Sequence, residues 1–312
     1  MPQQKQVNYS VVVPIYKEQG NIIPLDKEIK QVMSKLGSFE IIYVNDGSPD
    51  KSLEELHSLN NVRIINLNRN YGQATALDAG FKHAQGNIVI SLDGDGQNDP
   101  SDIPKLLQKM KKDKLDVVAG WRRKRKDASS IKILTRLGRL CRKIILKDPV
   151  HDTGCTLRVY SREAAKSLDL QGEMHRYILA LLKWKGFKIG EVEVNHRPRE
   201  NGKSAYNWTK AFRGFIDLIY ISFIQKYSQR PLHVFGYFSL LSFMIGTLSL
   251  GESIFARIVW NHSLNRNGFF FLGFFFLLAS LLFFSFGIII DLLIRTYHNS
   301  SHTERRYYIR NN

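Results

Sequence analysis

Two long apolar segments in the last quarter of the chain most restrict the fold that it can adopt. They occupy residues 232–256 and 268–294 and contain one carboxylate each, Glu252 and Asp291. Each segment is long enough to cross the roughly 30 Å hydrocarbon core of a bilayer as an α-helix. Both carboxylates lie near segment ends, where they can reach the membrane interface, which favours a structural role over an ion pathway. The sequence therefore predicts two transmembrane helices.

Basic residues are unevenly distributed around these two segments. The connecting stretch 257–267 has two, the stretch 203–230 before the first segment has five, and the tail after the second has four. Basic residues concentrate on the cytoplasmic side of membrane proteins. We therefore predict an integral membrane protein with its N-terminal domain and both termini in the cytoplasm, which in a prokaryote means the plasma membrane. Two spans also leave room for a homo-oligomer.

Two further segments, 130–147 and 206–230, are basic and amphipathic with helical spacing. Either could be an ordinary surface helix on a soluble core. The adjacent spans and the formal charge of +17, from 45 Lys and Arg against 28 Asp and Glu, favour contact with anionic lipid. We predict interfacial helices, with the lipid bilayer as partner. No nucleic-acid recognition motif accompanies the charge, so no nucleic-acid partner is predicted.

The first 125 residues alternate short β-branched runs with helical stretches. Strands are predicted at 9–14, 39–45, 62–67, 87–92 and 117–119, and helices at 22–36, 52–58 and 74–83. This alternation predicts an α/β domain with a parallel, doubly wound sheet.

Polar side chains follow several of the predicted strands. Tyr16 and Glu18 follow the first strand, Asp46 follows the second, and Asp93 and Asp95 follow the fourth. Ligands of such sheets bind beyond the carboxyl ends of the strands. We therefore predict a binding site at this edge.

Asp93 and Asp95 lie in the string SLDGDGQ, where they are separated by one glycine and followed by another. Residues two apart in an extended chain project to the same side, so both carboxylates can face one point. A hard divalent cation such as Mg²⁺ or Mn²⁺ would offset their repulsion and leave coordination positions for water and a diphosphate. A solvated turn is the alternative, but the position directly after a buried strand favours a metal site.

Several strings together resemble the nucleotide-sugar domain of family 2 glycosyltransferases: VVVPIYKEQGNI, VNDGSPD, LNRNYGQATALDAG and SLDGDGQNDP. HDTGCTLRVYSRE, the RENGKS block and the two apolar segments are similar to the branch that loads sugars onto polyprenyl phosphates. The resemblance implies a Rossmann-like (GT-A type) catalytic domain at 1–205, which includes the 130–147 helix. A juxtamembrane helix at 206–230 and a membrane domain at 231–312 with a cytoplasmic tail would follow.

The resemblance implies where the donor nucleotide binds. Pro14, Tyr16, Glu18 and Asp46 match family positions that hold the base and ribose, and Asp93 matches a position that faces the nucleotide diphosphate. For Glu18 and Asp46, a helix cap or a turn is the alternative role.

A metal site is implied by the same resemblance. Asp93, Asp95 and Gln97 match the positions that hold Mg²⁺ or Mn²⁺, with the side-chain oxygen of Gln97 as the third protein ligand. Asn98 and Asp99 lie beside Gln97 and leave the identity of that third ligand open.

Basic residues match family positions that bind phosphates. The implied phosphate-binding residues are Arg122, Arg136, Arg139, Arg199 and Lys203. Arg123 is an alternative to Arg122, and Arg197 is an alternative to Arg199. Asp152 matches an acidic position that faces the donor sugar, where it would orient the sugar or the acceptor. Asp95, Asp152 and Arg122 are thus the predicted catalytic residues.

The reaction implied by the resemblance is an inverting transfer from a nucleotide-diphosphate sugar to the phosphate of a membrane polyprenyl phosphate, such as dolichyl or undecaprenyl phosphate. Two other enzymes remain open: a transferase that uses a lipid-linked sugar or a diacylglycerol, and a processive polysaccharide synthase. The Gln-x-x-Arg-Trp motif of that synthase family does not occur in the sequence. A basic membrane adaptor without activity is the third alternative, against which both metal carboxylates and Gln97 argue.

Overall fold

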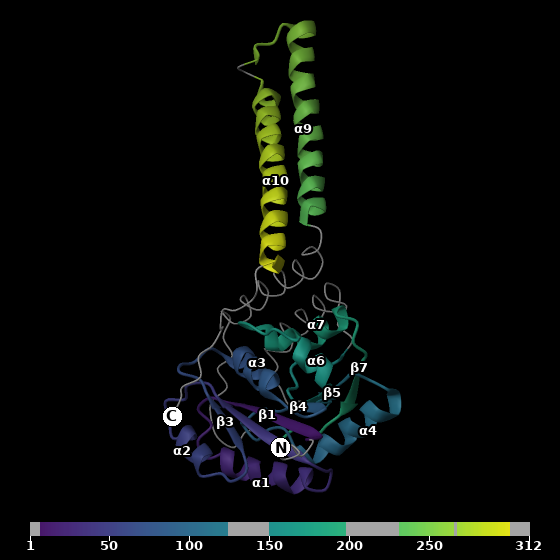
Figure 1. Cartoon of the computed structure of the whole chain (residues 1–312). Helices are drawn as coiled ribbons and strands as arrows, with labels where there is room; N and C mark the ends of the chain where they lie inside the picture. The colour runs from purple at the N-terminus through teal and green to yellow at the C-terminus, as the bar shows by residue number, and fades with distance from the viewer. Residues whose placement is uncertain (1–6, 124–149, 198–230, 265–266, 300–312) are drawn as a thin grey trace. The chain divides into compact units, whose positions relative to one another are not determined.

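The computed structural model describes residues 7–123, 150–197, 231–264 and 267–299. The chain divides into an N-terminal α/β unit and a C-terminal unit of two helices (Figure 1). The predicted interfacial helices at 130–147 and 206–230 lie outside the described residues, as does most of the predicted tail.

A seven-stranded sheet forms the centre of the α/β unit, with the order β3-β2-β1-β4-β6-β5-β7. The strands are β1 (Tyr9–Ile15), β2 (Phe39–Asn45), β3 (Arg63–Asn66), β4 (Ile88–Ser91), β5 (Val117–Trp121), β6 (Arg158–Ser161) and β7 (Ile189–Glu193). All five strands predicted from the sequence are present. Most of their β-branched residues are buried, on both faces, as expected for a sheet covered by helices on both sides.

The prediction of a parallel sheet is wrong at one strand. β6 lies between β4 and β5 and runs antiparallel to both. The segment before it is already at the carboxyl edge, where the Leu157 carbonyl accepts a hydrogen bond from the Gly120 amide (2.9 Å). Because β6 starts at this edge, it can only run back across the sheet.

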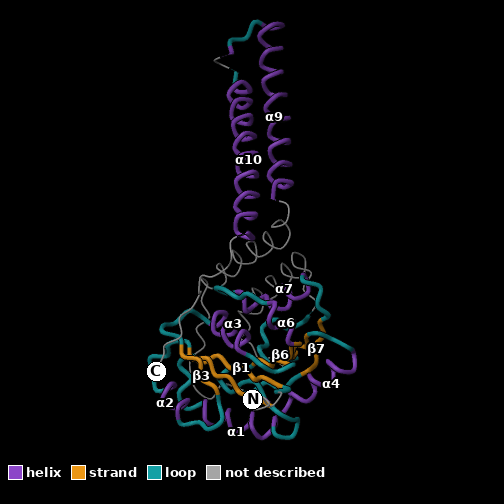
Figure 2. Tube along the Cα trace, viewed as in Figure 1, coloured by secondary structure: helices purple, strands orange, loops and turns teal. Residues whose placement is uncertain are grey.

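Helices cover both faces of the sheet (Figure 2). One face carries α3 (Gln73–His83), α6 (Arg162–Ser167) and α7 (Ile178–Trp184). The other carries α1 (Ile22–Met33), α2 (Ser52–His57) and α4 (Ile103–Asp113). Short 3₁₀ turns, η1 (Pro100–Asp102) and η2 (Met174–Tyr177), precede α4 and α7. Two apolar cores result, one on each side of the sheet.

The C-terminal unit is a pair of long apolar helices, α9 (Pro231–Trp260) and α10 (Gly268–Asn299). Both are long and apolar enough to cross a membrane, over Leu232–Trp260 and Gly268–Ile294. The helices approach closely at Gly246, where a Cβ atom would lie 3.0 Å from the Gly273 carbonyl oxygen. The Ser239 hydroxyl also donates a hydrogen bond to the Ser280 carbonyl (2.9 Å). Small residues and serine hydroxyls at the contact are typical of helix pairs in membranes.

Candidate active site

The carboxyl ends of β1 to β4 meet at one edge of the sheet, and the antiparallel β6 begins at the same edge. In the register of the sheet, Arg158 of β6 pairs with Ser91 at the end of β4 and with Ala119 in β5. The segment 150–157 therefore lies beside the loop that follows β4. This arrangement brings Asp152 to the same edge as Asp93 and Asp95.

Two glycines allow the loops at this edge to pack against one another. A Cβ atom on Gly94 would lie 2.5 Å from Ile15 Cδ1 and 3.2 Å from the Pro14 carbonyl oxygen, so the loop after β4 touches the end of β1. A Cβ atom on Gly47 would lie 2.5 Å from the Arg69 carbonyl carbon, so the loops after β2 and β3 also touch. The predicted nucleotide and metal residues thus share one compact loop cluster.

Gly47→Ala is expected to destabilise the α/β unit by about 2 kcal/mol, because Gly47 has φ +62° and its Cβ would meet backbone. Gly20→Ala is the matched control: Gly20 has φ +86°, but a Cβ there would meet nothing within 4 Å. The two thermal unfolding midpoints measure the difference. Equal losses in both variants would contradict the close approach of the two loops.

The predicted nucleotide-binding residues after β1 differ in exposure. Pro14 is buried within the strand, whereas the Tyr16 side chain is 41% exposed. Glu18 is partly buried, and its Oε2 accepts a hydrogen bond from Asn21 Nδ2 (2.8 Å). The Glu18 amide donates to Ser52 Oγ (3.0 Å). Glu18 therefore stabilises the turn before α1, and Tyr16 presents its ring to solvent.

Asp46 is almost fully buried, at 2% exposed. Its two carboxylate oxygens accept hydrogen bonds from the amides of Tyr71 (2.7 Å) and Gly72 (2.8 Å). Burial raises the pKa of Asp46, and these two hydrogen bonds oppose the shift. In the structure Asp46 holds the loop before α3 in place. Its direct contact with a nucleotide remains a prediction.

Asp93 and Asp95 lie close enough for their charges to interact. Burial and the neighbouring charge of Asp95 raise the pKa of Asp93 to about 6, against hydrogen bonding from Thr156 and the charges of Arg122 and Arg158. The Gln73 amide group donates a hydrogen bond to Asp93 Oδ1 (2.7 Å). A carboxylate whose pKa is raised by a second carboxylate beside it belongs to a site whose negative charge a cation would offset.

The Asp95 side chain stabilises the turn that follows it. Asp95 Oδ1 accepts a hydrogen bond from the Gln97 amide (3.1 Å), and Gly96 has φ +71°. No group of three or more Asp, Glu, His or Cys side chains suited to a metal occurs among the described residues. A divalent cation here would therefore need ligands beyond Asp93 and Asp95, such as an amide oxygen, water or a bound diphosphate. The donor set fits Mg²⁺ or Mn²⁺, which prefer oxygen ligands.

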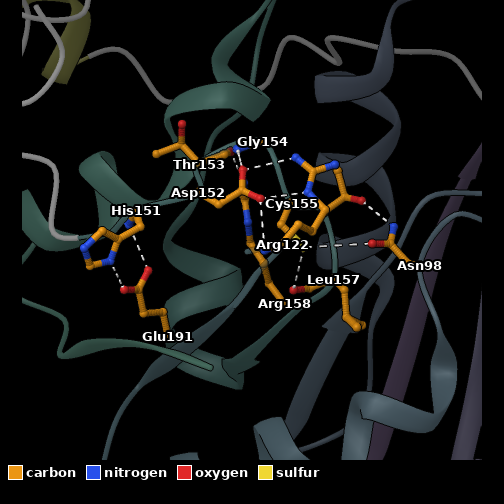
Figure 3. Close-up of polar contacts among 11 residues, drawn as sticks. Asn98, Arg122, His151, Asp152, Thr153, Gly154, Cys155, Leu157, Arg158 and Glu191 are labelled. Atoms are coloured by element: carbon orange, nitrogen blue, oxygen red, sulfur yellow. Dashed lines mark hydrogen bonds and ion pairs between the residues drawn. The ribbon is translucent and has the colours of Figure 1, made fainter. Parts of the chain in front are cut away.

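Arg122 and Asp152 form a bidentate ion pair (Figure 3). Arg122 Nε and Nη2 donate to Asp152 Oδ2 (2.7 Å) and Oδ1 (3.1 Å), and the two side chains are only 12% and 13% exposed. Burial alone would raise the pKa of Asp152, but the guanidinium and two backbone amides hold that pKa below its usual range. Asp152 is therefore a stable carboxylate and a poor proton acceptor.

Between the two alternatives left by the sequence, the structure places Arg122 at the carboxylates. Arg123 is 65% exposed and points to Glu193 (3.7 Å), with its guanidinium over the Trp121 ring. Arg122 instead interacts electrostatically with Asp93 as well as with Asp152. The predicted residues Asp93, Asp95, Arg122 and Asp152 are thus brought together.

Arg158 is a further site residue that the sequence analysis did not identify. It is buried at the start of β6, donates a hydrogen bond from Nη2 to the Thr153 carbonyl (2.7 Å), and interacts electrostatically with Asp93. The Thr156 hydroxyl, which hydrogen-bonds Asp93, also accepts from Asn98 Nδ2 (2.8 Å). The signal in the sequence that could have identified Arg158 is its position as a charged residue directly before the apolar residues Val159 and Tyr160. The predicted phosphate ligands Arg136, Arg139, Arg199 and Lys203 lie outside the described residues.

Comparison with known proteins identifies the family. Residues 10–169 match the sequence model of glycosyl transferase family 2, which covers all the described site residues from Pro14 to Asp152. The chain belongs to glycosyl transferase family 2. The resemblance stated from the sequence motifs is therefore confirmed.

Relatives within family 2 are similar over most of the chain. Dodecaprenyl-phosphate galacturonate synthase of Rhizobium johnstonii is 32% identical over 306 residues, which cover 94% of this chain and 90% of that protein. Undecaprenyl-phosphate 4-deoxy-4-formamido-L-arabinose transferase of Pseudomonas aeruginosa is 34% identical over 216 residues, or 67% of this chain and 63% of that protein. Both are named for transfer to a polyprenyl phosphate.

A solved enzyme structure shares the fold of the α/β unit. Glucosyl-3-phosphoglycerate synthase of Mycobacterium tuberculosis, crystallised with Mn²⁺, uridine diphosphate and phosphoglyceric acid, superposes with a TM-score of 0.55 at 18% identity. The match covers 70% of this chain and 78% of that one. The predicted Rossmann-like, GT-A type domain is confirmed by this likeness.

Proposed function

We propose that this family 2 glycosyltransferase transfers a sugar from a nucleoside-diphosphate sugar to the phosphate of a membrane polyprenyl phosphate. The observation that carries the proposal is the extent of the similarity to dodecaprenyl-phosphate galacturonate synthase. It covers 94% of the chain, too much to leave out either apolar helix. A catalytic domain joined to two such helices suits an acceptor that resides in a membrane.

The proposed reaction is a single displacement. An oxygen of the acceptor phosphate attacks the anomeric carbon of the donor sugar, the bond from that carbon to the diphosphate breaks, and the nucleoside diphosphate leaves with the electron pair. A phosphate monoester is already ionised near pH 7, so it needs no general base. The pairing of Asp152 with Arg122 supports this reading, because a carboxylate held by a guanidinium is a weak base.

Cations would hold the two anionic substrates together. Asp93, Asp95 and Gln97 would hold Mg²⁺ or Mn²⁺, which when bound offsets the negative charge of the leaving diphosphate. Arg122 lies near Asp93 and can contribute positive charge to the same place. Asp152 would keep the Arg122 guanidinium oriented toward the substrates. Arg136, Arg139, Arg199 and Lys203 remain proposed ligands of the acceptor phosphate and diphosphate.

The proposed location is a membrane, with the catalytic domain and both termini in the cytoplasm. The two apolar helices support membrane insertion, and the surplus of basic residues outside the short connecting loop supports this orientation. The catalytic site would then act on an acceptor phosphate at the level of the lipid headgroups.

The test is transfer of radiolabel from a panel of nucleoside-diphosphate sugars into a short polyprenyl phosphate by the purified full chain. We expect one donor to label the lipid with Mg²⁺ or Mn²⁺, and chelator to prevent the labelling. Release of nucleoside diphosphate without lipid labelling would contradict the acceptor. Supplying a lipid-linked sugar or diacylglycerol instead would then separate the alternatives. Labelling in the presence of chelator would contradict the metal requirement.

A further inference from the structure

The segment that leaves β7 runs along the metal-binding loop that follows β4. His196 forms an isolated antiparallel bridge with Asn98, and the Arg197 amide donates a hydrogen bond to the Gln97 carbonyl (2.9 Å). Directly before His196, the Asn195 backbone amide donates a hydrogen bond to Asp102 Oδ2 (2.6 Å), which belongs to a fully buried carboxylate. The loop is therefore held along its length by residues about a hundred positions away in the chain.

The Arg197 side chain adds a second tie to the same loop. Its Nη1 donates to both carboxylate oxygens of Glu28 on α1 (2.8 and 3.0 Å), and its Nη2 lies 3.0 Å from Asp99 Oδ1. Arg197, Glu28 and Asp95 also line one small hollow between α1 and the loop. A planar guanidinium can bridge two carboxylates in fixed directions, which an ammonium group cannot. Arg197 thus joins α1, the loop after β4 and the segment after β7.

These contacts fix the turn that presents Asp95. The Asp95 carboxylate accepts from the Gln97 amide, and the carbonyl of Gln97 accepts from the Arg197 amide. Asp99, two residues further on, is held by the Arg197 guanidinium. Arg197 therefore restrains the loop at two points, at the Gln97 carbonyl through its backbone amide and at Asp99 through its side chain. Arg197 itself carries no metal-ligating atom, because a guanidinium only donates hydrogen bonds.

We propose that Arg197 is a positioning residue that holds the Asp95–Asp99 loop in its metal-binding conformation. This inference rests on the proposed function, since it assumes that Asp93 and Asp95 hold a divalent cation. From the sequence, Arg197 was an alternative to Arg199 as a phosphate ligand. Here Arg197 acts instead by holding the loop. Residues that orient metal ligands commonly affect metal affinity by one to two orders of magnitude.

The test is direct Mn²⁺ binding, measured by electron paramagnetic resonance of free Mn²⁺ on the purified full chain without donor. Arg197→Met should raise the dissociation constant of Mn²⁺ about tenfold. Arg197→Lys should recover only part of the affinity, because it can pair with one carboxylate but not bridge both. Lys109→Met is the matched control. It removes a partly exposed ion pair with Asp113 on α4 and should leave Mn²⁺ binding unchanged.

The thermal unfolding midpoint separates positioning from general damage. Because ion pairs of partly exposed side chains contribute little to stability, Arg197→Met should unfold close to the unaltered chain. If it does not fold, Glu28→Gln, which weakens one of the two ties by removing its negative charge, should still weaken Mn²⁺ binding. Unaltered Mn²⁺ affinity in a folded Arg197→Met or Glu28→Gln variant would overturn this inference but not the proposed function. Absence of Mn²⁺ binding by the unaltered chain would instead contradict the metal site of the proposed function.

Discussion

Asp95→Asn is expected to abolish sugar transfer while the protein stays folded. An amide oxygen carries no charge, so the variant loses one of the two carboxylates that would hold the cation. The fold should survive because an asparagine Oδ1 can still accept the hydrogen bond from the Gln97 amide that shapes the turn. We expect transfer to fall about a hundredfold or more, which corresponds to about 2.7 kcal/mol or more of lost transition-state stabilisation.

The measurement is the rate of label transfer at saturating Mg²⁺ or Mn²⁺, with the thermal unfolding midpoint measured in parallel. Asp113→Asn is the matched control, because Asp113 is a partly exposed carboxylate at the end of α4 that pairs with Lys109 (2.7 Å). That variant should transfer label at the unaltered rate. Residual activity above about a tenth in Asp95→Asn would argue against a cation held by the two carboxylates.

Most strands and helices of the α/β unit could be predicted because the signal is local. Runs such as Tyr9–Ile15 and Phe39–Asn45 are rich in β-branched and aromatic residues and are mostly buried in the centre of the sheet. β6 is only four residues long and starts with a charged residue, Arg158, so its sequence lacks a continuous apolar run. The direction of a strand depends in addition on where the preceding segment lies, which no local pattern records.

The candidate site shows the same division between local and distant signals. Asp93 and Asp95 could be paired from the sequence because they are only two positions apart and directly follow a strand. The contact between Arg122 and Asp152 joins residues thirty positions apart and exists because β6 begins at the carboxyl edge. The tie between Arg197 and Asp99 likewise depends on β7 lying beside β5. Their residue types were noticed in the sequence, but their partners were fixed only by the topology.

Arg122→Met is expected to remove transfer activity and to destabilise the α/β unit by about 3 kcal/mol. The reason is that Asp152, 13% exposed, would keep its charge without its cation. Amides of residue 122 and Gly154 still donate to Asp152, which limits the loss. For a domain of this size the thermal unfolding midpoint should fall by roughly 6–12 °C.

The double variant Arg122→Met with Asp152→Leu separates structure from chemistry. Replacing a buried ion pair by apolar side chains is often close to neutral, so the double variant should regain most of the lost stability. It should not regain transfer, because the positive charge near Asp93 is still absent. Recovery of both stability and transfer would show that the pair only supports the fold, and would remove Arg122 from the proposed phosphate-binding residues.

The pH dependence of stability and of the transfer rate gives an independent check on the pair of Arg122 and Asp152. The pKa of Asp152 is lower in the folded protein than its usual value, which is near 3.9. The pair therefore stabilises the folded protein at pH values above that usual pKa. This stabilisation disappears as the pH falls through the folded-state pKa. The double variant lacks the carboxylate, so its stability should decline less steeply on the acid side. For the same reason Asp152 should contribute no ionisation to the transfer rate between about pH 6 and 8, whereas a general base tuned for catalysis would titrate there.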